Sequence, residues 1–126
     1  MSSKLDAQCV QLERAVTRLA AALRQPKDEF IRDSSIQRFE FSFELVWKTL
    51  KTAVEDRGLR VYSPKDALRA AFQVGLIDDD PLWLETVELR NRTTHVYSEA
   101  IAEEIYVRLP AVLGLYERLL ARLKSW

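Results

Sequence analysis

The residues best suited to chemistry in this sequence lie in one short run that begins at Arg90 and ends at Tyr97. His95 is the sole histidine of the chain, so acid–base chemistry near neutral pH would fall to its ring. Arg90 and Arg92 place fixed positive charge beside this ring, and Asn91 adds an amide. A proton-transfer group beside positive charge suits a phosphodiester substrate. A lone histidine also rules out a two-histidine zinc site, so we expect no bound metal.

The spacing of this run poses a geometric problem for a regular helix. At about 100° per residue, Arg90 and His95 would lie about 140° apart around the helix axis. Two solutions stay open: the helix ends near Thr93 and Thr94 and the chain folds His95 back, or a second subunit completes the site. Asn91 lies four residues before His95, so in a regular helix it would share the face of the ring and could orient it.

The same residues also fit a purely structural role. Cations in the last turn of a helix complement the negative end of its dipole, so the cluster could be a plain helix terminus. Tyr97 would then be an aromatic side chain packed across the junction. The functional interpretation instead expects Tyr97 to be exposed, at or beyond a helix end, with Ser98 capping the next helix.

The composition indicates what kind of scaffold holds these residues. The chain has 126 residues, 48% of them hydrophobic, which predicts one globular domain over residues 1–126. Its three glycines and four prolines are too few to punctuate a sandwich or a barrel, so we expect helices. Basic and acidic residues number 19 each, so any RNA contact must be local.

Other features of the sequence favour a cytoplasmic location. Cys9 is the single cysteine and cannot form an internal disulfide, which suits a reducing cytosol. The N-terminus lacks the apolar segment of a signal peptide. No apolar run approaches the roughly 18 residues that a membrane-spanning helix needs. We therefore expect neither export nor insertion into a membrane.

Apolar residues recur at helical spacing in two long segments of the first half of the chain. The first predicts a helix over 5–23. The second predicts a longer, aromatic-rich helix over 36–54, with Asp33 or Ser34 as its N-cap and Gly58 just after its last turn.

Two short helices are expected next. Ser63 and Pro64 have the residue types of an N-cap and a first helical position, and Gly75 should end the helix that they begin. Asp80 and Pro81 repeat this pattern and begin the helix that carries the candidate site.

A last long helix is expected over 105–123, where Pro110 should kink it or mark a new first turn because proline lacks an N–H. The whole pattern predicts an all-α fold, an antiparallel up-and-down bundle of four to five helices. Phe41 and Leu45 form a second apolar stripe, which predicts either a homodimer interface or burial within one subunit. The expected core consists of Leu12, Val16, Leu19, Phe39, Phe43, Val46, Leu50, Val87, Leu109, Val112 and Leu119.

The candidate site resembles the motif of a known family. Arg90-Asn91-x-x-x-His95-x-Tyr97 is similar to the R-x4-H-x-Y motif of HEPN-domain proteins. Within them it resembles the HepT-like family, also called nucleotidyltransferase substrate-binding proteins.

The likeness extends well beyond the motif. The segment 36–50, IQRFEFSFELVWKTL, resembles the second helix of that family, and the segment 63–77 resembles its short third helix. The resemblance covers roughly residues 30–120, in the same order as in the family.

This resemblance implies a HEPN-like helical bundle that forms a two-fold homodimer and is encoded next to a minimal nucleotidyltransferase. In HepT-like toxins the Arg and His of the motif carry metal-independent RNA cleavage, for which no cofactor is expected. The partner silences the toxin by AMPylation of the motif tyrosine. Transferred to this sequence, Arg90 and His95 are the catalytic pair and Tyr97 is the modification site. Asn91 and Arg92 would bind the substrate or orient the catalytic side chains.

Two functions therefore stay open. In the first, the chain is the ribonuclease toxin of a toxin–antitoxin pair: an RNA 2′-hydroxyl attacks the adjacent phosphate, His95 moves the proton and Arg90 stabilises the phosphoryl charge. In the second, it is a non-catalytic substrate-binding subunit of the nucleotidyltransferase, and Arg90, Arg92 and His95 only hold a phosphate or an acidic surface. Catalysis needs Arg90 and His95 to converge, whereas binding tolerates them apart.

Overall fold

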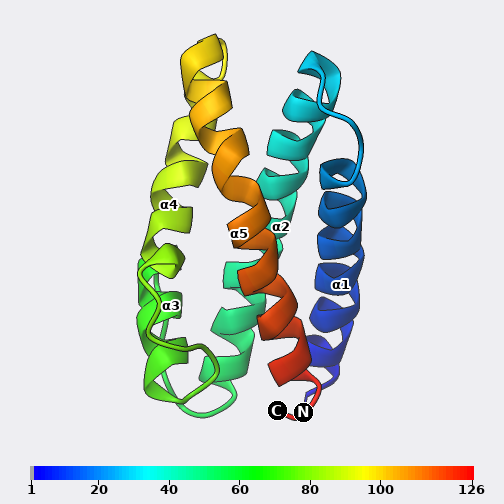
Figure 1. The fold of residues 1–126 in the computed structure, drawn as a ribbon. Coiled ribbons are helices and arrows are strands. Elements are labelled where there is room, and N and C mark those ends of the chain that lie inside the picture. Colours follow the sequence, from blue (N-terminus) through cyan, green and yellow to red (C-terminus); the bar gives the residue numbers. More distant parts are fainter. Residues whose placement is uncertain (1) are drawn as a thin grey trace.

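The computed structural model describes residues 2–126, and every regular element in that range is helical (Figure 1). A short 3₁₀ turn, η1 (Thr93–His95), lies between the last two α-helices. The prediction of an all-α bundle is confirmed. The α-helices are α1 (Ser3–Leu23), α2 (Glu29–Glu55), α3 (Pro64–Gln73), α4 (Leu82–Arg92) and α5 (Glu99–Leu123).

The long helices run alternately up and down the bundle (Figure 1). α2 packs against all the other α-helices, and α5 packs against α1, α2 and α4. The α4–α5 junction and the α1–α2 turn lie at one end of the bundle, and the two chain ends lie at the other (Figure 1). None of the helices in residues 2–126 is long and apolar enough to cross a membrane.

α2 begins earlier than the sequence predicts. Its N-cap is Asp28, whose carboxylate accepts a hydrogen bond from a backbone N–H of the first turn at 2.7 Å. The prediction of Asp33 or Ser34 as the cap is therefore wrong. Asp33 instead accepts a hydrogen bond from Arg32 at 3.0 Å. The apolar repeat becomes visible only from Ile36 because the buried position one turn before it is Arg32, which pairs with Glu99 and Glu103 of α5.

The other helix ends follow the predicted residue types. Ser63 caps α3 through its hydroxyl oxygen. Gly58 and Gly75 follow α2 and α3 with φ of 90° and 80°, a left-handed conformation that glycine adopts without strain. The Asp80 carboxylate accepts from the first N–H of α4 at 2.9 Å, and this helix begins one residue later than predicted, just after Pro81.

The core forms where the predicted apolar stripes meet, and every residue predicted for it is buried. α5 continues through Pro110, so the alternative of a new first turn at this proline is wrong. Pro110 is exposed, whereas Leu109 and Val112 on the inner side are fully buried. Burial of the adjacent turns thus holds the helix together across the missing hydrogen bond.

Candidate functional site

The run from Arg90 to Tyr97 begins in the last turn of α4 and passes through η1 to the start of α5. α4 ends at Arg92, and the next three residues tighten into η1. The Thr93 hydroxyl donates to the Arg90 carbonyl oxygen at 2.6 Å, which satisfies one of the carbonyl groups left free at a helix end. The prediction that the helix ends near Thr93 and Thr94 is confirmed.

Arg90 extends from α4 toward α2. Its Nη2 lies 3.5 Å from Glu44 Oε1, and its Cζ lies 5.0 Å from the ring centroid of Phe43, within cation–π range. Its Nε is buried and has no hydrogen-bond partner among residues 2–126. The guanidinium is therefore held on one side by a ring and a carboxylate, and it keeps one buried donor unused.

A second carboxylate of α2 faces the same arginine. Burial raises the pKa of Glu40 above its usual value, and the Thr93 hydroxyl and the Arg90 charge offset part of that rise. Neither Glu40 nor Glu44 was predicted from the sequence as a member of the candidate site. Their signal was present, because two acidic residues four positions apart share one face of an otherwise aromatic helix segment.

His95 and Tyr97 lie against each other on the surface. His95 Nδ1 is 3.3 Å from the Tyr97 hydroxyl oxygen, and the two ring centroids are 5.9 Å apart. Tyr97 is 78% exposed, as predicted, and is not packed across the junction. Asn91 is also exposed, and no hydrogen bond between its side chain and the His95 ring is present in residues 2–126.

Arg92 turns toward α5 and forms an ion pair with Glu104. This pair ties the end of α4 to the second turn of α5. Part of the positive charge that the sequence places beside His95 is thus neutralised by an acidic neighbour.

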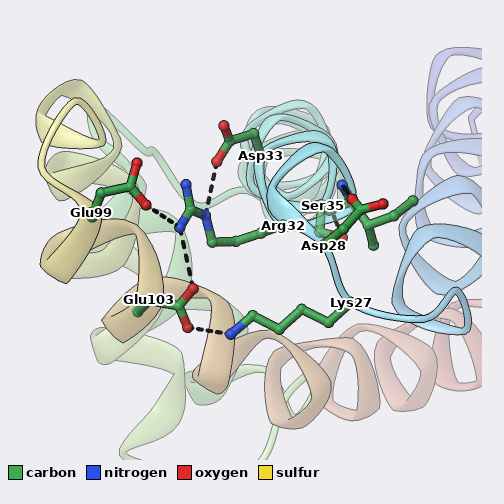
Figure 2. Close-up of polar contacts among 8 residues, drawn as sticks. Lys27, Asp28, Arg32, Asp33, Ser35, Glu99 and Glu103 are labelled. Carbon is green, nitrogen blue, oxygen red and sulfur yellow. Dashed lines mark hydrogen bonds and ion pairs between the residues drawn. The ribbon is translucent and has the colours of Figure 1, made fainter.

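The start of α5, which follows η1, is held by a buried arginine of α2 (Figure 2). The Arg32 side chain is 5% exposed, and its Nη1 donates to Glu99 Oε2 at 2.5 Å and to Glu103 Oε1 at 3.2 Å. Its Nε donates to Asp33 at 3.0 Å. Lys27 completes the group with a contact of 2.5 Å to the other oxygen of Glu103.

These contacts favour the ionised forms of Glu99 and Glu103. The hydrogen bond from Arg32 lowers the pKa of Glu99, and hydrogen bonds from Lys27 and Arg32 lower the pKa of Glu103. The hydrogen bonds of Arg32 to Glu99, Asp33 and Glu103 raise the pKa of its guanidinium. The first turn of α5 is therefore tied to the first turn of α2 at neutral pH, which fixes the junction that carries His95 and Tyr97.

The candidate site thus consists of two groups. One contains Arg90 with Glu40 and Glu44, and the other contains His95 with Tyr97. No hydrogen bond, ion pair or ring contact joins Arg90 to His95 in the described part of the chain. Nor do residues 2–126 contain a cluster of three or more His, Cys, Asp or Glu side chains arranged to hold a metal ion.

The chain is similar to proteins of a known family along nearly its whole length. The family described as "Nucleotidyltransferase substrate binding protein like" matches residues 3–125. A protein of Haemophilus influenzae described as a probable ribonuclease HepT is 31% identical in an alignment that covers 96% of this chain and 90% of that protein.

Solved structures share the fold. A Thermus thermophilus protein is 40% identical, with a TM-score of 0.84 over 89% of this chain and 98% of that one. A Haemophilus influenzae structure, described as the fold of a substrate-binding domain of a nucleotidyltransferase, is 30% identical with a TM-score of 0.71 and covers 95% of this chain and 96% of its own. A tri-AMPylated HEPN toxin of Shewanella oneidensis, in complex with MNT antitoxin, is 19% identical with a TM-score of 0.79 over 100% of both chains, and shares the fold.

Proposed function

We propose that this chain is a ribonuclease toxin whose partner is a minimal nucleotidyltransferase. The premise is that the chain belongs to the HepT-like HEPN family of nucleotidyltransferase substrate-binding proteins. The observation that carries the proposal is the exposed pair of His95 and Tyr97, which lies in the same short run as the partly accessible guanidinium of Arg90. An arginine guanidinium is a strong donor to phosphate oxygens. The curated relative described as a probable ribonuclease is similar over the same residues.

The proposed reaction uses a nucleophile that belongs to the RNA. The 2′-hydroxyl oxygen attacks the adjacent phosphorus, its proton passes to the His95 imidazole, and the bond to the 5′-oxygen breaks. The products are a 2′,3′-cyclic phosphate and a 5′-hydroxyl, which receives a proton in turn. Arg90 stabilises the charge that builds on the non-bridging phosphoryl oxygens. The reaction needs no metal to generate its nucleophile.

Tyr97 is the proposed site of silencing. The partner would transfer AMP to its hydroxyl oxygen, which is solvent-exposed and therefore accessible to a modifying enzyme. The new phosphodiester would form on an oxygen that lies 3.3 Å from His95 Nδ1, in the space that the RNA backbone must occupy. The negative charge and the bulk of the nucleotide would both exclude RNA.

The test is RNA cleavage by the purified chain in the presence of EDTA. The unmodified chain should cleave, and His95→Ala should lower the rate at least about 100-fold because the proton-transfer group is lost. The fold should survive, since His95 is exposed. Thr94→Ala, a change at the exposed neighbour, is the matched control. Cleavage that persists in His95→Ala, or that requires added Mg²⁺, would contradict the proposal.

A non-catalytic substrate-binding subunit is the second candidate function. It is favoured by the absence of any contact between Arg90 and His95 in residues 2–126, and by the pairing of Arg90 with Glu44. Expression of the chain without its neighbouring nucleotidyltransferase separates the candidates. Arrested growth favours the toxin, whereas normal growth together with a faster nucleotidyltransferase reaction favours the binding subunit.

We also propose that the chain is cytoplasmic, in keeping with its single cysteine. We propose further that it forms a homodimer in which Arg90 of one subunit and His95 of the other complete one site. Such a composite site would resolve the separation of the two groups in one chain. Sedimentation at micromolar concentration should give twice the mass of the chain. A monomer mass would remove the composite site from the mechanism.

A further inference from the structure

A groove of about 290 Å³ runs between α1 and α2, outside the α4–α5 junction. Arg14 and Arg18 line it from α1, and Arg38, Phe41 and Leu45 line it from α2. Cations and an aromatic ring thus meet along one open channel.

The three arginines carry unbalanced positive charge. None of them forms an ion pair with a carboxylate in residues 2–126, although seven other basic side chains do. Arg38 donates one hydrogen bond, to the carbonyl oxygen of Arg18 at 2.7 Å. The acidic residues of these helices face elsewhere: Glu13 lies in a separate hollow beside the end of α5, and Glu44 contacts Arg90. The groove is therefore positive within a chain of net charge zero.

The groove also offers an apolar surface. The Phe41 ring is 54% exposed, and Leu45 lies one turn further along the same helix. Guanidinium groups that follow a phosphate backbone, together with an exposed ring on which a base can stack, are the two elements of sites for single-stranded nucleic acid.

The groove lies next to the candidate site. Phe41 and Leu45 flank Glu44 on α2, and Glu44 contacts Arg90 of α4. Residues three and four positions apart are neighbours on a helix surface, so the groove and the Arg90 group occupy adjoining faces of one helix. A strand that lies in the groove would therefore reach Arg90 across α2, past the Glu44 carboxylate.

We propose that this groove binds single-stranded RNA, with Arg14, Arg18 and Arg38 on its phosphates and the Phe41 ring against a base. The proposal rests on the ribonuclease function proposed above and names the substrate class of that site. It also reassigns Phe41 and Leu45, which the sequence analysis considered for a dimer interface. A two-fold contact through this groove would bring the unpaired guanidinium groups of both copies together, and such like-charge contacts disfavour association.

The test measures binding of a fluorescent single-stranded RNA of about ten nucleotides to the His95→Ala chain, in which the RNA should stay intact. Replacement of Arg14, Arg18 and Arg38 together by Gln should weaken binding at least about tenfold at low salt. It should also reduce the slope of log K against log salt concentration by about two, because each phosphate contact contributes about 0.7.

The matched control removes the same charge elsewhere. Arg60, Lys65 and Lys124 are exposed surface residues that form no ion pair in the described residues. Their joint replacement by Gln should leave the salt slope unchanged. Phe41→Leu keeps the apolar surface and removes the stacking ring, so it should weaken binding about tenfold without a change in slope.

Four outcomes would overturn the proposal. The parent chain could bind no RNA, or the triple variant of the groove could keep the parent's affinity and salt slope. Equal binding of double-stranded RNA would remove the single-strand assignment. A triple variant that binds RNA normally but loses self-association or the nucleotidyltransferase would assign the groove to a second copy or to an acidic partner. RNA cleavage by the unmodified chain is measured separately, so the ribonuclease function can stand while the groove proposal fails.

Discussion

Arg90 lies between an aromatic ring and two carboxylates, and this neighbourhood decides how much positive charge it can offer to a phosphate. Its ion pair with Glu44 is partly exposed, with 35% and 41% of the two side chains accessible. Such a pair contributes only about 0–1 kcal/mol to stability. The carboxylate matters more through its charge, because it competes directly with any anion that approaches Arg90.

Glu44→Gln should therefore lower the KM for RNA while changing the free energy of unfolding by less than about 1 kcal/mol. The amide oxygen can still accept the hydrogen bond that the Trp47 indole donates to Glu44 at 3.0 Å. Steady-state cleavage and urea unfolding of the same preparation measure both quantities. A higher KM would mean that Glu44 positions Arg90 instead of shielding it.

Tyr97→Phe should abolish AMP transfer, since it removes the acceptor oxygen and keeps the ring. Intact mass is measured after incubation with the neighbouring nucleotidyltransferase, ATP and Mg²⁺. Tyr62→Phe is a suitable control because Tyr62 is 79% exposed, almost the same as Tyr97 at 78%, and lies outside the motif. Equal AMP addition to the unmodified chain and to Tyr97→Phe would show that another group is the acceptor.

Single residues show where sequence reasoning reached its limit. His95 and Tyr97 are candidate site residues because their residue types and spacing match a motif, and the predicted exposure of Tyr97 follows from a local helix end. Glu40 and Glu44 were missed because a pattern on one helix does not reveal which helix it opposes. Whether Arg90 and His95 act together depends on the distance between two surfaces, which spacing along the chain does not determine.

Among the helices, α5 has its first two turns held by one buried side chain. Its first turn is bound to Arg32, a side chain 5% exposed that the apolar repeat of α2 does not include. The predicted start of α2 is too late for this reason: in its first turns the inward position is a charged residue that binds the acidic start of α5, and not an apolar one. Hydrophobic periodicity thus located α2 but not its first two turns.

Arg32→Met should destabilise the chain most at neutral pH. The pKa values of Glu99 and Glu103 are lowered in the folded chain, so their stabilising contribution is complete above the ordinary value of 4.5 and is lost as the pH falls through the lowered values. The variant leaves these carboxylates and Asp33 together without their shared cation. The difference in free energy of unfolding between the variant and the unmodified chain should therefore shrink as the pH falls below about 4.5.

Urea unfolding at about pH 7 and about pH 4 measures this change. Arg108→Met is the control, because Arg108 forms an exposed pair with Glu85 and its loss should cost about 0–1 kcal/mol at either pH. If Arg32→Met lowers the free energy of unfolding equally at both pH values, Arg32 stabilises the chain through packing alone.

For the whole molecule, burial at the centre of the bundle sets stability. Leu109 is fully buried, and Leu109→Ala should cost about 2–5 kcal/mol in the free energy of unfolding. Val107 lies on the same helix but is 64% exposed, so Val107→Ala should change the free energy of unfolding by about 0.5 kcal/mol or less. Coincident urea transitions by circular dichroism and Trp fluorescence would support the predicted single domain of residues 1–126. Separate transitions would contradict it.

The architecture could be predicted because each long helix carries its own apolar stripe and each chain reversal after α2 has a recognisable cap or glycine. Leu12, Phe39 and Leu109 belong to three different stripes, and all three are 0% exposed. The groove between α1 and α2 could not be predicted in this way. It arises because Arg14 and Arg38, far apart in sequence, meet when two amphipathic helices pack at one particular rotation.

The position of the chain ends has a practical consequence. Ser2 and Trp126 line the same hollow, and both ends lie away from the α4–α5 junction (Figure 1). A short Gly- and Ser-rich bridge could therefore connect them, and the chain could be reopened at the exposed turn between α1 and α2. Such a circular permutant would keep the same core and place its new termini at the end of the bundle that carries His95. Tags or reporters attached there would sense events at the site, and those attached to the original ends would leave it unobstructed.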